Sequence, residues 1–398
     1  MVLVIGGGLA GSLAALALRQ RGLPVTLLSP APAPASASPY SYGGVPWWAA
    51  PSLARAPELW QALERRHGPL GWQPCKLTLH GGCAHPPGAL GCPCPGATGP
   101  GVTGAGAGSP PWDGAPWAST TADPQALAAA GAGVKALLAA AGATGLELLG
   151  DQGQLLGLEL PYGRVDSSIL AAALPAALER AGVRRRPGSA LALESPGGSP
   201  WRVRLAAGDT LEADTVLLAA GAASGQLWPA LTPELATSWA GVLALNADDL
   251  APSDLPPGAD AGIVMPLLGQ RQALEQHTPS LAEARAVVDA GLAPWGAAWL
   301  LGQISLVNPL GQFAPEPDPA WMEARLRSGL ARVWPQLAWL PATYHQMPVS
   351  FTAHGVPLVG PVADAPGLWV CAGLGAPFAA LPPLLETLAD QLAAGAGS

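Results

Sequence analysis

The sequence predicts an α/β protein in which a Rossmann-like domain is interleaved with an α+β domain. The chain begins with the apolar run Val2–Ile5, a glycine-rich turn at 6–11 and an Ala/Leu-rich stretch. Apolar runs at 215–220 and 368–372, each followed by a glycine, indicate buried parallel strands much later in the chain. Because 398 residues exceed what one small core organises, we expect two domains or one interleaved pair.

The first element is a βαβ unit, with a helix over 9–21 that ends before Gly22 and a second strand at 25–28. The turn reads Gly-x-Gly-x-x-Gly through Gly6, Gly8 and Gly11. In this pattern the glycines allow a tight turn, close approach to a pyrophosphate and close helix–strand packing, while the helix N-terminus faces the negative charge. The pattern therefore predicts nucleotide binding, and a turn chosen for packing alone is the alternative.

Ser29 stands at the end of the second strand, where a carboxylate usually binds the ribose of NAD. The first acidic residue of the chain is Glu58, and no arginine occurs between Arg21 and Arg55 to suit NADP. FAD tolerates the missing carboxylate better, because a long cofactor is held at several other points. We therefore expect FAD, with Ser29 beside its ribose.

The middle of the chain alternates loops with helices. Residues 86–124 are dense in Gly and Pro and predict a long insertion, after which 127–149 regain helical character. A further helix is expected over 167–180, with Asp166 as its N-cap and a kink at Pro175.

The second half predicts paired strands at 190–193 and 201–205, and short strands with loops over 239–345. One amphipathic helix is expected over 319–334. A terminal helix is expected from about Pro382.

The net charge of −8 argues against a nucleic-acid partner, and the basic run 184–186 is interpreted as a solvated strand entrance. Residues 1–18 carry no charge, but Arg19 and Arg21 follow this apolar region, whereas a signal peptide has its basic residues before it. We expect a cytoplasmic protein without stable membrane insertion, acting on a small-molecule substrate.

Four cysteines, Cys75, Cys83, Cys92 and Cys94, lie near His80 and His85 in a Gly/Pro/Cys-rich insertion near 74–124. The Cys-Pro-Cys spacing is not that of a zinc knuckle, so free thiols are expected rather than a metal site. Zinc binding and a disulfide stay open as alternatives.

Three blocks, 2–28, 163–228 and 344–392, together resemble the D-amino-acid oxidase superfamily, in particular its glycine oxidase and sarcosine oxidase branch. The second block contains Gly163-Arg164-Val165-Asp166 and the run 213–222, and the third contains 355–361 and 368–375. The resemblance implies an FAD-binding domain at 1–50, 160–230 and 345–398, and a substrate domain at 51–159 and 231–344. The implied cofactor-binding residues are Gly6, Gly8, Leu9, Ala10, Gly11, Ser29, Gly43, Gly44, Gly221, Ala222, Gly373, Leu374 and Gly375.

The resemblance also implies the oxidation of a C–N bond of a small amine or amino-acid derivative, with the backbone amides of 373–376 near the flavin ring. The family commonly has an arginine and, five residues later, an aspartate, where this chain has Val349 and His354. His354 is the candidate catalytic residue, and Tyr344 and His345 are weaker candidates. Trp47 and Trp48 are interpreted either as a wall of the flavin site or as packing.

The alternatives are a flavoprotein with non-oxidase chemistry on a hydrophobic substrate, and a binding or regulatory protein that retains FAD without turnover. Arg164 and Arg271 are the cations that could replace the missing arginine.

Overall fold

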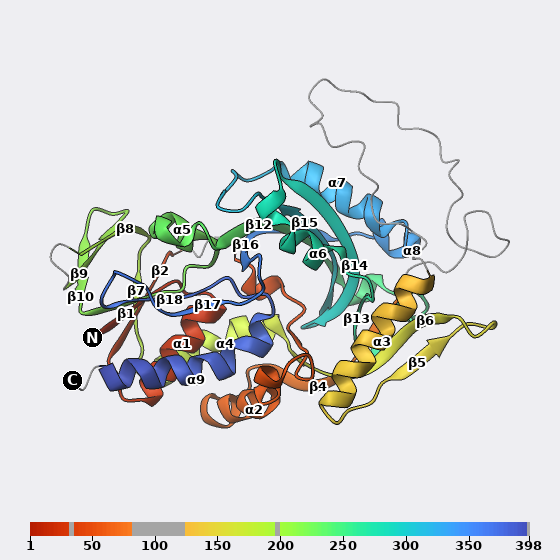
Figure 1. The fold of residues 1–398 in the computed structure, drawn as a ribbon, viewed down its shortest axis with the longest axis horizontal. Helices are drawn as coiled ribbons and strands as arrows, with labels where there is room; N and C mark the ends of the chain where they lie inside the picture. The colour runs from red at the N-terminus through yellow and green to blue at the C-terminus, as the bar shows by residue number, and fades with distance from the viewer. Residues whose placement is uncertain (32–35, 82–123, 196–199, 396–398) are drawn as a thin grey trace, which may run out of the picture.

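A computed structural model describes residues 1–31, 36–81, 124–195 and 200–395. Two large sheets lie side by side, and a small three-stranded sheet covers the outer face of the first (Figure 1). The six-stranded sheet has the order β17 (Leu358–Pro361), β18 (Leu368–Ala372), β11 (Thr215–Leu218), β1 (Val2–Ile5), β2 (Val25–Ser29) and β7 (Arg184–Pro187). This arrangement confirms the α/β class with a Rossmann-like sheet.

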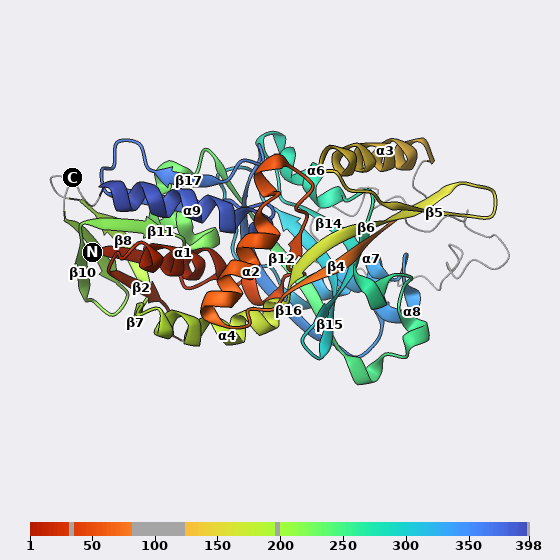
Figure 2. The same cartoon turned by 90° about the horizontal axis from the view of Figure 1, so that it is seen from below.

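The inner strands β1, β2, β11 and β18 of this sheet are largely buried on both faces, which explains their apolar runs, whereas three of the four residues of the edge strand β7 are exposed. Val2 and Val4 of β1 face a core with α1 (Leu9–Gln20), α4 (Ser167–Arg180) and α9 (Pro377–Gly395). Leu3 and Ile5 face the small sheet of β8 (Ala190–Glu194), β9 (Trp201–Leu205) and β10 (Thr210–Ala213). Figure 2 shows α1 and α9 side by side along the sheet.

The second sheet has nine strands, and several are much longer than the short strands expected over 239–345. Long antiparallel pairing in one sheet explains the length, because β12 is held along its whole length by β15 and β16, which lie far from it in the chain. Its strands are β16 (Thr343–Thr352), β12 (Leu235–Asn246), β15 (Ala298–Val307), β14 (Arg285–Trp295), β13 (Gly262–Pro266), β4 (Trp72–His80), β6 (Leu155–Val165) and β3 (Gly44–Val45), with β5 (Leu146–Leu149) paired to β6.

Two helices of the second half, α6 (Gln270–Gln276) and α7 (Pro319–Leu330), pack on the nine-stranded sheet. The amphipathic helix expected over 319–334 is α7, followed by the short α8 (Pro335–Ala338). The helical character expected over 127–149 holds only for α3 (Pro124–Ala140), because Leu146–Leu149 pair with β6. The other helices are α2 (Ala56–His67) and α5 (Ser224–Leu227).

The terminal helix α9 begins at Pro377, earlier than the prediction from Pro382. Proline inside a helix leaves the carbonyl four residues earlier without its amide donor. For Pro382 this carbonyl is that of Phe378, and Trp60 of α2 donates its indole N–H to it at 2.6 Å. A tertiary hydrogen bond thus replaces the missing helical one.

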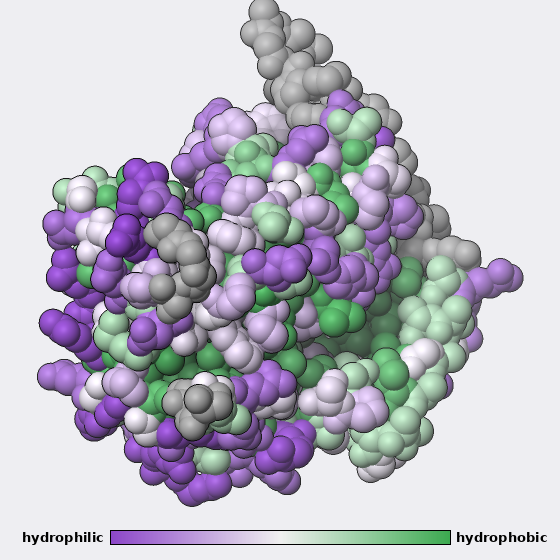
Figure 3. All heavy atoms as spheres, turned by 60° about the vertical axis from the view of Figure 1, so that its left-hand side comes forward, coloured by the Kyte–Doolittle hydropathy of each residue, from purple (hydrophilic) through white to green (hydrophobic). Residues whose placement is uncertain are grey.

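Hydrophilic residues cover most of the face seen in Figure 3, and hydrophobic residues gather in a hollow at its right. Among the described residues, no helix combines the length and the apolar character needed to cross a membrane.

Candidate functional site

The glycine-rich turn lies at the carboxyl end of β1. Gly6 has φ +114°, and a Cβ at this position would lie 2.3 Å from the carbonyl oxygen of Ala219. A Cβ at Gly11 would lie 1.8 Å from the oxygen of Gly6, so helix α1 could not approach the strand with any other residue there. Both glycines are therefore required by packing, as the pattern predicted.

The start of α1 offers amide donors. The amide of Leu9 donates to the Ser38 hydroxyl at 2.9 Å. Within the described part of the chain, the amides of Gly8, Ala10 and Gly11 have no acceptor. A Cβ at Gly8 would meet only the Ser38 hydroxyl, at 3.4 Å. Free amides at a helix N-terminus suit a phosphate, so these residues fit the pyrophosphate of a dinucleotide.

Ser29 ends β2 directly beside this turn. A Cβ at Gly7 would lie 2.7 Å from the Ser29 Cβ, and the Ser29 carbonyl accepts from the amide of Gly188 at 2.9 Å. The Ser29 side chain therefore lies against the glycine-rich turn.

Two other predicted cofactor segments reach the same edge, because β11 and β18 run parallel to β1. Gly221 and Ala222 follow β11, and Gly373, Leu374 and Gly375 follow β18. Gly373 has φ +70°, and a Cβ there would lie 2.7 Å from the Thr352 side chain at the end of β16. The edge is thus also where β16 of the second sheet arrives.

Gly43 and Gly44 lie against β6. Gly43 has φ +69°, and a Cβ there would lie 1.8 Å from the carbonyl oxygen of Val165. Gly44 pairs with Arg164, and a Cβ on it would lie 2.5 Å from the Tyr162 hydroxyl. Packing alone thus requires a small residue at both positions.

An apolar and aromatic cluster lies where the loop 37–42 meets β12, β15 and β16. Val349, at the place of the family's arginine, packs in it. The side chains that pack in it are apolar or aromatic. Burial raises the pKa of the hydroxyl of its member Tyr42, and the charges that act on this hydroxyl are Asp289, which raises its pKa further, and Arg271, which lowers it. We call it the aromatic–aliphatic cluster; its members are Ala37, Tyr40, Tyr42, Ala240, Val242, Ala244, Trp295, Leu300, Met347 and Val349.

His345 lies beside this cluster. Its ring stacks on that of Tyr40 with centroids 4.0 Å apart, and the Trp295 ring lies 6.3 Å away. Burial lowers the pKa of His345, which keeps the ring neutral at neutral pH. The neighbouring candidate Tyr344 packs instead against the core beneath α7 and α8, and its hydroxyl donates to Gln346 at 3.0 Å.

The candidate His354 lies on the turn after β16, about half exposed. Its Nδ1 accepts from the amide of Val356 at 3.2 Å, and its Nε2 lies 3.8 Å from a Glu234 carboxylate oxygen. This geometry favours a role in ordering the turn over one in the chemistry.

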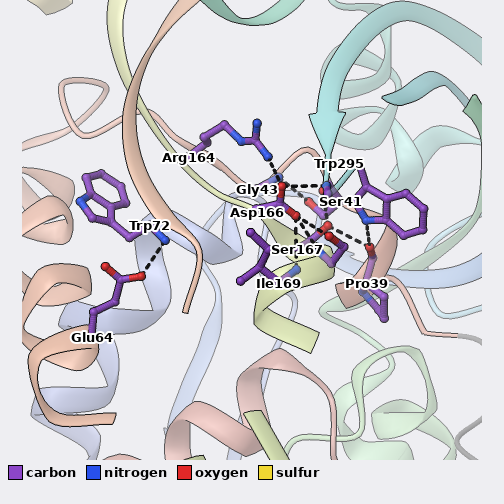
Figure 4. Close-up of polar contacts among 12 residues, drawn as sticks. Pro39, Ser41, Gly43, Glu64, Trp72, Arg164, Asp166, Ser167, Ile169 and Trp295 are labelled. Atoms are coloured by element: carbon purple, nitrogen blue, oxygen red, sulfur yellow. Dashed lines mark hydrogen bonds and ion pairs between the residues drawn. The ribbon is translucent and has the colours of Figure 1, made fainter. Parts of the chain in front are cut away.

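The two arginines considered as replacements are both paired. Arg164 and Asp166 form a buried ion pair of 2.7 Å, with 3% and 6% of their side chains exposed (Figure 4). Arg271 binds Glu275 at 2.8 Å within α6. Each guanidinium is thus engaged by one carboxylate, although the buried Nε of Arg164 has no hydrogen-bond partner among the described residues and Arg271 is near enough to Tyr42 to lower the pKa of its hydroxyl.

The remaining residues considered in the sequence, two tryptophans and a cysteine, pack in the hydrophobic cores. Trp48 is buried and its indole donates to Pro161 at 2.8 Å, whereas Trp47 is half-buried between two cores. Burial raises the pKa of Cys371 to about 12, which agrees with an inert thiol.

Most of the cysteine-rich insertion, including Cys83, His85, Cys92 and Cys94, lies outside the described residues. Cys75 is a free thiol on β4, and burial raises its pKa to about 11. The described ranges contain no group of three His, Cys, Asp or Glu side chains able to hold a metal.

Sequence reasoning missed Ser38, Ser167 and Trp295, whose hydrogen bonds assemble the loop 37–43. The sequence predicts that Asp166 caps the helix that follows it. Its hydrogen bond to Gly296, 130 residues away, could not be predicted from the residues around Asp166.

A model of the FAD dependent oxidoreductase family matches residues 1–391 of the chain. The tRNA 5-methylaminomethyl-2-thiouridine biosynthesis bifunctional protein MnmC of Verminephrobacter eiseniae (strain EF01-2) is 31% identical over 210 residues, covering 46% of this chain and 30% of that protein. The chain thus spans less than a third of that relative's length.

Among solved structures, glycine oxidase from Geobacillus kaustophilus has a TM-score of 0.68 and 17% identity, covering 99% of this chain and 94% of that one. Iminodiacetate oxidase from Chelativorans sp. BNC1 has a TM-score of 0.67 and 16% identity, and the match covers 99% of this chain and 95% of that one. At these identities the likeness shows a shared fold.

Proposed function

Since the chain belongs to the family of FAD dependent oxidoreductases, we propose that it oxidises the C–N bond of a small, uncharged or hydrophobic amine or amino-acid derivative. The aromatic–aliphatic cluster carries this proposal, because it places Val349 among apolar side chains where a carboxylate-binding cation would be needed. The solved structures with the same fold include proteins named as oxidases of glycine and iminodiacetate.

We assign FAD binding to residues 1–50, 160–230 and 345–398, and substrate binding to 51–159 and 231–344. In support, all strands of the six-stranded sheet come from the first group. The amides of Gly8, Ala10 and Gly11 would hold the pyrophosphate, and the Ser29 hydroxyl would accept a hydrogen bond from the ribose.

FAD, when bound, supplies the acceptor for the hydride that leaves the carbon of the C–N bond. The task of the protein is then to position the substrate and exclude water. Tyr40, Trp295 and Val349 would form an apolar wall against the substrate. The amides that follow Gly373, at the start of α9, would stabilise negative charge near the ring.

The apolar wall sets the substrate preference. A carboxylate buried without a partner costs several kcal/mol. His345 offers no compensating charge, because its pKa is lowered by burial and the ring is neutral. Amines without a free carboxylate are therefore the preferred class.

The apolar side chain of Val349 at the place of the family's arginine also supports a second candidate, a binding or regulatory protein that retains FAD without turnover. Anaerobic reduction of the bound flavin separates the two. The purified protein is loaded with FAD and screened against a panel of amines, amino acids and amino amides, with the visible absorbance as the readout. Bleaching by one class of amine supports the oxidase, whereas an FAD-loaded protein that no compound bleaches supports the second candidate.

A further inference from the structure

The chain passes from the nine-stranded sheet to the six-stranded sheet at Asp166. Val165 is the last residue of β6, and Ser167 is the first residue of α4, which packs with α1. The backbone amide of Asp166 donates to Gly71 at 2.8 Å. The crossing point is buried, and the polar contacts in Figure 4 gather around it.

The two carboxylate oxygens of Asp166 have different partners. Oδ1 accepts from the amide and hydroxyl of Ser168, at 3.0 and 2.7 Å, and from the amide of Ile169 at 3.3 Å. Oδ2 accepts from Arg164 at 2.7 Å and from the amide of Gly296 at 2.9 Å. A helix N-cap needs only one oxygen, so the second is used for a segment 130 residues away.

Gly296 is at the tip of the hairpin formed by β14 and β15, with φ +58°. A Cβ at Gly296 would lie 2.9 Å from the Ser168 hydroxyl, so the hairpin tip lies directly on the first turn of α4. The residue before it, Trp295, donates its indole N–H to the carbonyl of Pro39 at 2.7 Å.

Ser167 reaches the same loop from the other side. Its hydroxyl lies 2.8 Å from the carbonyl oxygen of Pro39 and 2.7 Å from that of Ser41, and can donate its proton to either. This loop carries Tyr40, which stacks on His345, and continues into Gly43. The loop is thus held between the start of α4 and the hairpin tip.

We propose that Asp166 and Ser167 are positioning residues that join the hairpin tip and the loop 39–43 to α4 and so hold Tyr40 and Gly43 at the edge of the FAD site. The inference rests on the proposed FAD site and adds the residues that shape its wall. Asp166 fixes the hairpin through Gly296, and Ser167 and Trp295 fix the loop by sharing the Pro39 carbonyl. Neither Asp166 nor Ser167 needs to touch the substrate.

The test compares Ser167→Ala with Ser168→Ala in the full chain. Both variants lose one hydroxyl from the first turn of α4, but only Ser167 contacts the loop. Hydrogen exchange of peptides covering 36–46 and 293–299 is measured before FAD is added, and exchange in the 36–46 peptide should rise for Ser167→Ala and stay unchanged for Ser168→Ala. Asp166→Asn, which keeps a good N-cap residue, should raise exchange in the 293–299 peptide by more than the general rise that the loss of the ion pair with Arg164 causes elsewhere.

The second readout is the dissociation constant of FAD. We expect it to rise about tenfold in Ser167→Ala, the effect of losing one buried hydrogen bond, and to stay unchanged in Ser168→Ala. Because Ser167 and Trp295 share one acceptor, Ser167→Ala and Trp295→Phe should have non-additive effects on this constant.

The outcomes separate the two proposals. Wild-type protein that takes up no FAD would overturn the proposed function, and the inference with it. Wild-type protein that binds FAD, with equal exchange and equal FAD affinity in the two serine variants, would overturn the inference alone.

Discussion

The indole N–H of Trp60 donates to the carbonyl oxygen of Phe378 at 2.6 Å, and the two rings stack with centroids 6.3 Å apart. The bond joins α2 to the carbonyl that Pro382 leaves without a helical donor. Trp60 is fully buried, so this bond has no competition from water.

Trp60→Phe should lower the free energy of unfolding by about 1–3 kcal/mol, because it leaves a buried carbonyl without a donor. Chemical denaturation monitored by circular dichroism measures the change. Trp339→Phe is the matched control, since 65% of Trp339 is exposed and its loss should change little. Equal effects of the two variants would contradict the assigned role of the Trp60 bond.

Gly11→Leu should abolish FAD uptake, because the side chain would push α1 away from the carbonyl of Gly6. The measurement is the visible flavin absorbance of protein incubated with FAD and then desalted. Gly133→Ala is the control, since a Cβ at Gly133 on α3 meets nothing within 4 Å. A Gly11→Leu variant that binds FAD normally would show that the turn does not hold the cofactor.

Ser29→Glu should tighten FAD binding by about 1 kcal/mol, because a charged acceptor for the ribose hydroxyls replaces a hydroxyl. Titration of FAD against the apoprotein measures this change. Ser29→Ala should weaken binding if the hydroxyl makes the contact. Unchanged affinity in both variants would mean that the ribose is held elsewhere.

An amino amide should be oxidised faster than its free acid at neutral pH, because the acid would bury a carboxylate beside Val349. Anaerobic flavin reduction by matched pairs of acid and amide measures the preference. Val349→Arg should shift the preference toward the acid by supplying a bidentate partner. Faster reduction by the acid in the wild type would show that another cation serves the site.

Asp166→Asn should destabilise the protein by about 3–5 kcal/mol at neutral pH, because Arg164 is left buried without its partner. Burial raises the pKa of Asp166, but the Ser168 hydroxyl, the Gly296 amide, the Arg164 guanidinium and the Ile169 amide outweigh it, and the pKa is lowered. The stabilisation is therefore present above the unfolded pKa of about 3.9 and is lost as the pH falls through the lower folded value.

Urea denaturation of both proteins as the pH is lowered checks this dependence, and their stabilities should converge only at strongly acidic pH. Asp390→Asn is the control, because the exposed pair of Asp390 with Arg21 should contribute less than about 1 kcal/mol. A stability difference between wild type and Asp166→Asn that does not change with pH would contradict a lowered pKa of Asp166 in the folded protein.

Local sequence is sufficient to specify the βαβ unit with its glycines, the N-cap at Asp166 and the strand Leu368–Ala372, because each depends on residues adjacent in the chain. It also indicates FAD, through the turn at Gly6 and the absence of a carboxylate at Ser29. These features are local, so their pattern is present in the sequence itself.

The start of α9 and the length of the strands in the nine-stranded sheet depend instead on tertiary packing. Local rules favour proline at the first position of a helix and so start α9 at Pro382, but the Trp60 donor that allows an earlier start lies 318 residues from Phe378. The contact of Asp166 with Gly296 likewise joins residues 130 positions apart. Such partners become neighbours only when the sheets pack, so the physical reason for these features is absent from any window of the sequence.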